Sequence, residues 1–163
     1  MTTPRAHHRR RAGCAIVRIT AVALTVWLQA SWVTAQKLTL AVTPSTVSFA
    51  SADPDTTPTI VAAPITVSVR VQSNSGAWHL TVQANGDLLS GGATIDATQV
   101  SWTAAPPPFQ NGTLSKVAAQ PIASGTGNVN PAINGSVVFR LANSWNYSAG
   151  IYSQTIVFTL SAP

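Results

Sequence analysis

Hydrolytic chemistry needs a base that is poised near neutral pH, and the segment after residue 35 contains a single histidine, His79. His79 alternates with Trp78 and Leu80, which predicts that its side chain faces solvent on the polar side of a strand. No G-x-S-x-G turn presents a serine nucleophile, and the chain has no glutamate. Asp87 and Asp96 stand alone in sequence, without the paired carboxylates of a glycosidase. We therefore expect no catalytic residues and no enzyme activity.

The sequence also contains few side chains that could ligate a metal ion. Asp53 and Asp55 flank Pro54, and two carboxylates at this spacing could supply oxygen ligands to Ca²⁺. Calcium normally gathers six to eight oxygens, and no neighbouring residues complete the set, so a solvated turn is the preferred interpretation. The only cysteine is Cys14, and with a single later histidine a zinc site is not expected. We predict no metal and no cofactor.

Aromatic side chains offer binding chemistry of another kind. Trp102 and Trp145 border proline-rich or polar segments, and Tyr147 follows closely, so all three could stack on a sugar ring or anchor a partner. Trp78 shares its predicted face with Leu80 and favours a core position. Trp102, Trp145 and Tyr147 are therefore candidate glycan-stacking residues, with capping of a hydrophobic core as the alternative for the two tryptophans.

The N-terminal segment carries an export signal. Its excess positive charge precedes an apolar stretch at residues 19–30, and small or β-branched residues lie before a cut after Ala35. The basic residues of this segment are Arg5, Arg9, Arg10, Arg11 and Arg18. The apolar core is shorter than the ~20 residues that span a bilayer. We predict a signal peptide at residues 1–35 and a secreted, cell-surface-associated domain at residues 36–163, with no stable membrane span after cleavage; an uncleaved anchor is the alternative.

Removing 35 residues from 163 leaves 128, the usual size of one domain. This remainder is electrically neutral, because its four basic residues match its four aspartates: Lys37, Arg70, Lys116 and Arg140 against Asp53, Asp55, Asp87 and Asp96. A neutral domain lacks the basic surface that binds phosphates, which excludes nucleic acid as a partner. Without cysteine it has no disulfide, so packing must supply its stability.

Apolar residues recur with period two after residue 36, which predicts strands and no amphipathic helix. The clearest segments are residues 37–42, 65–72, 78–84, 100–103, 137–141 and 152–160. A further short strand is expected at residues 114–118, and the small and polar residues 119–135 indicate a long exposed loop. Pro106, Pro107 and Pro108 predict a surface connection. Seven or eight such strands favour an all-β fold with two packed antiparallel sheets, an immunoglobulin-like or related β-sandwich.

Two segments together resemble the WxL domains of bacterial cell-surface proteins. Trp78-His79-Leu80 reproduces the first W-x-L motif, and the final residues contain Ala149-Gly150-Ile151-Tyr152 before a closing proline. The second motif is changed to Phe158-Thr159-Leu160. Terminal strands of this type are also similar to those of spore-coat-U-like and pilus-like secreted β-sandwiches. The resemblance implies non-covalent binding to a cell-wall polymer by Trp78, Leu80, Phe158 and Leu160, unless these residues belong to the core.

The resulting hypothesis is a secreted, non-enzymatic structural or adhesive module of the bacterial cell envelope that binds a wall polymer or a surface protein. One alternative is a self-associating subunit of a surface fibre, in which the strand edges at residues 38–42 or 152–160 accept or donate a strand. Another alternative is a carbohydrate-binding module that uses the aromatic side chains near its loops.

The predicted cleavage site can be tested directly. N-terminal sequencing of the exported protein is expected to begin at Gln36, because Ala35 is the last small residue before the domain. A chain that still begins at Met1 or Thr2 would contradict cleavage and favour the anchored form.

Overall fold

Antiparallel strands fill the part of the chain that the computed structural model describes, residues 36–73 and 75–162. The larger sheet has the order β1-β3-β10-β7-β8, and β2 also pairs with β10. Its strands are β1 (Lys37–Thr43), β2 (Thr59–Val61), β3 (Ile65–Gln72), β7 (Val100–Ala105), β8 (Gly112–Thr113) and β10 (Val129–Ala142). The predicted signal peptide lies outside the described residues.

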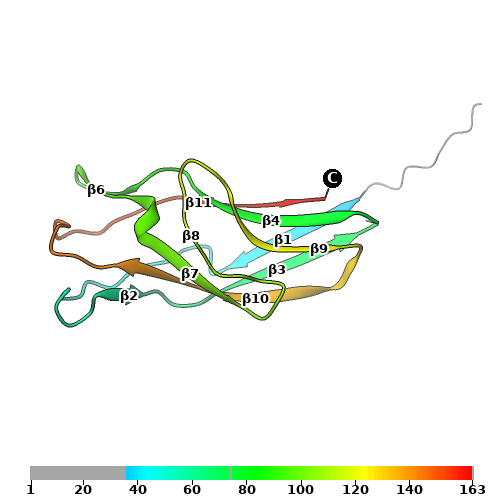
Figure 1. Cartoon of the computed structure of the whole chain (residues 1–163), viewed down its shortest axis with the longest axis horizontal. Helices are drawn as coiled ribbons and strands as arrows, with labels where there is room; N and C mark the ends of the chain where they lie inside the picture. Colours follow the sequence, from blue (N-terminus) through cyan, green and yellow to red (C-terminus); the bar gives the residue numbers. More distant parts are fainter. Residues whose placement is uncertain (1–35, 74, 163) are drawn as a thin grey trace, which may run out of the picture. The chain divides into compact units, whose positions relative to one another are not determined.

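The second sheet has the order β11-β4-β9 and packs against the first (Figure 1). Its strands are β4 (Ala77–Ala84), β9 (Gln120–Thr126) and β11 (Ile156–Ser161). A separate hairpin joins β5 (Leu88–Ser90) to β6 (Ala93–Ile95), and a single 3₁₀ turn, η1 (Ala97–Gln99), leads into β7. The prediction of an all-β, antiparallel two-sheet sandwich is confirmed.

Alternation of apolar and polar residues explains the central strands. In β3, Ile65, Val67, Val69 and Val71 are buried, and the residues between them are exposed or half-buried. In β4, the buried positions are occupied by Trp78, Leu80, Val82 and Ala84. Because each strand turns one face inward, the core lies between the two sheets and is built from both.

The predicted loop at residues 119–135 is wrong, because β9 and the first half of β10 occupy it. These strands contain few large apolar residues of their own. Aromatic rings from other segments of the chain lie over their glycines and supply the apolar contacts. Gly125 lies directly opposite Trp78, and a Cβ atom at Gly125 would stand 2.7 Å from Cζ2 of that ring. Phe109 covers Gly135 in the same way.

Two other expected segments also differ. The short strand expected at residues 114–118 is not present, because only Gly112–Thr113 pairs with β7 and the chain then turns to reach β9. The final strand begins at Ile156 rather than Tyr152, since the preceding residues make only an isolated bridge between Ser153 and Leu89. The strands at residues 37–42, 65–72, 78–84 and 100–103 are confirmed.

The contact between Trp78 and Gly125 can be tested by adding one methyl group. Gly125→Ala is expected to lower the free energy of unfolding by about 1–3 kcal/mol, because the new Cβ overlaps the indole ring in a closely packed core. Urea denaturation measures this change.

Gly86→Ala is the matched control, since no atom lies within 4 Å of a Cβ at that glycine. It should stay within about 0.5 kcal/mol of the wild type. Equal stability for the two variants would show that the ring does not require a glycine beneath it.

Candidate functional site

One side of the sandwich is left open where both sheets end. β1 is the outer strand of the larger sheet and pairs only with β3, while β11 is the outer strand of the smaller sheet and pairs only with β4, among the residues described. β1 and β11 contact each other across the sandwich. Two strands with unpaired outer edges therefore border the same side.

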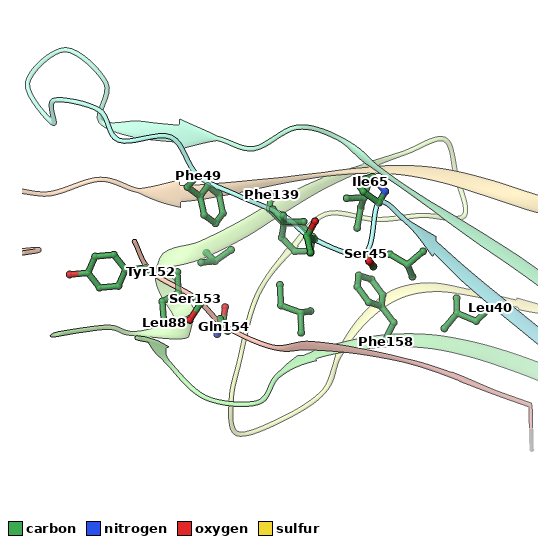
Figure 2. A pocket seen from close by; sticks show the side chains of 16 residues that line it. Leu40, Ser45, Phe49, Ile65, Leu88, Phe139, Tyr152, Ser153, Gln154 and Phe158 are labelled. Carbon is green, nitrogen blue, oxygen red and sulfur yellow. The ribbon is translucent and has the colours of Figure 1, made fainter. Parts of the chain in front are cut away.

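An apolar groove enters the core between these strands (Figure 2). Its volume is about 550 Å³, within the usual range of ligand-binding cavities. Figure 2 shows the Phe158 ring pointing from β11 into the space between the sheets. No lining residue is charged. The lining consists of Leu40, Val42, Pro44, Ser45, Thr46, Val47, Phe49, Ile65, Leu88, Val100, Phe139, Tyr152, Ser153, Gln154, Ile156 and Phe158.

The inward-facing side chains of β1 and β11, the strands that border the groove, are at most half-buried. Ile156, Phe158 and Leu160 of β11 alternate with exposed residues, yet each of the three is half-buried rather than buried. Leu40 and Val42 of β1 are half-buried in the same way. By contrast, the inward residues of β3 and β4 are fully buried. Apolar surface at the open side therefore remains available to a partner.

The opposite side of the sandwich is closed by the segment between β7 and β9. This segment buries Phe109 and Leu114 in the core. Its backbone joins both sheets, because the Leu114 amide donates to the Val100 carbonyl at 2.8 Å and the Gln110 amide donates to the Ile122 carbonyl at 2.9 Å. On the open side the segment after β1 lines the groove, but its Val47 and Phe49 are only half-buried against the core. The two sides of the sandwich are therefore closed to different extents.

The four residues implied by the WxL resemblance divide into two pairs. Trp78 is only 2% exposed and Leu80 is buried, so both belong to the core. Phe158 and Leu160 are half-buried at the open side. Pairing of β11 with β4 places Leu160 opposite Leu80, which brings the two motifs side by side.

The prediction that Trp102 stacks on a glycan is wrong, because its side chain is only 1% exposed. The chain folds back after the prolines, and the indole Nε1 donates to the Gln110 carbonyl at 2.8 Å. Gly112 lies opposite Trp102 on the neighbouring strand, and the Phe139 ring meets the indole edge-on with centroids 6.5 Å apart. Trp102 is a core residue.

Trp145 and Tyr147 lie elsewhere, in the loop between β10 and β11. Trp145 is 68% exposed and Tyr147 is half-buried, and both line a second cavity at one end of the sandwich. This location agrees with the expectation that they border a polar loop. The structure does not bring them to the groove.

The remaining polar residues considered from the sequence occupy surface positions. His79 is exposed on the outer face of β4, as its alternation with Trp78 predicts. Asp53 forms a turn in which its Oδ1 accepts a hydrogen bond from the Asp55 amide at 2.9 Å. Across residues 36–73 and 75–162, no three histidine, cysteine, aspartate or glutamate side chains gather where they could hold a metal ion. No helix in this part of the chain is long and apolar enough to cross a membrane.

A charged cluster fastens the β5–β6 hairpin to the segment that closes the opposite side. Lys116 Nζ lies 2.7 Å from Asp87 Oδ2 and 3.3 Å from Asp96 Oδ2. The pKa of Asp96 is lowered to about 2, chiefly by the hydrogen bond from the Thr98 amide, then by the Thr98 hydroxyl and the Lys116 ammonium. The pKa of Lys116 is raised by its bonds to Asp87 and Asp96. Leu88 of this hairpin lines the groove, so the cluster braces one end of it.

The chain matches no protein-family model, and no curated protein and no solved structure is significantly similar to it. The resemblance to WxL domains therefore stays a prediction from short motifs.

The charged cluster predicts a specific acid sensitivity. A carboxyl group whose pKa is lower in the folded chain stabilises the fold above its ordinary pKa of 3.8, and this contribution is lost as the pH falls towards about 2. Asp96→Asn is therefore expected to show a smaller loss of stability than the wild type over this range. Urea denaturation at several pH values measures the difference, and identical pH profiles would contradict the assigned role of Asp96.

Proposed function

We propose that this chain is a secreted, non-enzymatic structural module of the bacterial cell surface, and that two copies assemble by β-strand pairing along the open side. The observation that carries the proposal is the uncharged groove bordered by two unpaired strand edges. The predicted signal peptide and the WxL resemblance support the location.

The chemistry of the open side favours a β-strand as its partner. An outer strand presents backbone N–H and C=O groups that can pair with another extended chain. The half-buried side chains beside it, such as Phe158 and Ile156, favour a partner that is apolar on its inward face. A strand with alternating residues meets both requirements at once.

A second copy of this chain provides such a strand. β11 has the sequence IVFTLS, which contains no charged residue and no proline, the usual devices that protect an outer strand from pairing. Pairing β11 with β11 of another copy is self-complementary about a two-fold axis. Because β1 and β11 border the same side, this arrangement closes a dimer, whereas a fibre needs head-to-tail contacts.

Direct binding of a wall polymer by the first W-x-L motif is less well supported. Trp78 and Leu80 would have to leave the core to make that contact, which would expose large apolar side chains and open cavities. Of the four implied residues, only Phe158 lines the groove, and Leu160 is half-buried on the same strand. We therefore favour strand pairing over wall binding as the role of this region.

A charge placed on the outer strand tests the proposal. Val157→Lys changes a residue of β11 that is 47% exposed, and a lysine there opposes edge-to-edge pairing without entering the core. Sedimentation velocity across a dilution series is expected to show a wild-type dimer and a Val157→Lys monomer, with at least a tenfold weaker dimer constant (about 1.4 kcal/mol).

Val117→Lys is the matched control, since Val117 is 86% exposed and lies in the loop before β9. It should dimerise like the wild type, and both variants should keep the wild-type melting temperature of the monomer. A monomeric wild type at all concentrations would reject self-pairing. Equal weakening by both lysines would show that charge alone, rather than the strand edge, controls association.

A further inference from the structure

A second cavity lies at the end of the sandwich where residues 49–54 meet residues 143–150. Its volume is about 560 Å³, and its buried floor is formed by Ile60, Ile95 and Leu141. Phe49 and Tyr152 line both this cavity and the groove, so the two are neighbours. We call it the loop-end pocket.

Trp145 is held in place despite its exposure. Its indole Nε1 donates to Asp55 Oδ1 at 2.9 Å, which ties one loop to the other. Asn143 braces the same pair of loops, because its Nδ2 donates to the carbonyls of Ala52 and Thr57 at 3.0 Å each. A large aromatic side chain that is exposed yet anchored loses little conformational entropy when a ligand covers it.

The pocket also has a defined charge. Asp53 is its one charged lining residue, and its carboxylate is exposed. No basic residue lines the pocket, so a polyanionic ligand would meet only repulsion there. The polar groups beside the aromatic rings include Ser51, Ser144 and Ser148. Hydroxyl or ammonium donors on the ligand suit a carboxylate acceptor of this kind.

We propose that the loop-end pocket binds a carbohydrate chain that is neutral or bears amino groups. Trp145 stacks against the apolar face of one sugar ring, Tyr147 lines the same pocket, and Asp53 accepts hydrogen bonds from hydroxyl or ammonium groups. The buried floor admits an apolar ring face, while the rim satisfies polar groups, which is the usual division in small-ligand sites. The named contacts do not include the outer edge of β11, and sugar binding would make the module adhesive.

Calorimetric titration of the full chain with three hexasaccharides tests the proposal: cellohexaose, which is neutral, a glucosamine hexamer, which is cationic, and a galacturonate hexamer, which is anionic. We expect saturable binding of the neutral or the cationic sugar and at least tenfold weaker binding of the anionic one. Trp145→Ala should weaken binding at least tenfold, as loss of a central aromatic anchor does. Val117→Ala should bind like the wild type.

The contribution of the hydrogen bond between Trp145 and Asp55 can be tested separately from that of the indole ring. Asp55→Asn keeps an oxygen acceptor for the indole N–H and should retain binding within about threefold, whereas Asp55→Ala frees the ring and should weaken binding more. Far-ultraviolet circular dichroism and melting curves confirm that each variant is folded. Absence of binding to the neutral and cationic sugars, equal or tighter binding of galacturonate, or wild-type affinity in Trp145→Ala would each overturn the proposal.

Discussion

Aromatic rings that lie over strand glycines hold the core of this protein together. Trp78 covers Gly125 within the smaller sheet, Trp102 covers Gly112 within the larger one, and Phe109 covers Gly135 from the connecting segment. In each case the ring occupies the space where any other side chain would begin. The described domain contains no cysteine, and its cluster of salt bridges lies at the surface, so burial of the hydrophobic core, to which these contacts belong, must carry most of its stability.

The same packing closes only one side of the sandwich. Phe109 and Leu114 are buried because the segment that carries them also forms backbone hydrogen bonds to both sheets. Across the core, the segment after β1 only half-buries Val47 and Phe49, and a groove of about 550 Å³ remains between β1 and β11. The proposed pairing of two copies follows from this asymmetry, since a strand from outside can do there what the connecting segment does on the other side.

Sequence patterns predicted the strands whose own residues alternate. β3 and β4 carry an apolar residue at every second position, so the sequence alone predicts which side chains of each strand are buried. β9 and the first half of β10 could not be predicted, because the large side chains that cover them belong to Trp78 and Phe109, far away in sequence. Trp102 was misassigned for a different reason: its burial depends on the chain folding back after the prolines, so that the nearby Gln110 and Gly112 lie against the indole.

The candidate sites were predictable only in part. Trp145 and Tyr147 were named from their polar neighbours, but the pairing of Trp145 with Asp55 joins residues 90 positions apart and has no local signal. The edges at residues 38–42 and 152–160 were each recognised as strands that could accept a partner. Their location on one side of the sandwich depends on the order of strands within both sheets, which periodicity does not encode.

Hydrogen–deuterium exchange of the amides in β11 tests the open side most directly. If a second copy pairs there, the outward-facing amides of Ile156–Ser161 should exchange rapidly in dilute solution and become protected at high protein concentration. Amides of Gln120–Thr126, next to the closed side, should exchange equally at both concentrations. Protection of β11 that does not change with concentration would contradict the account.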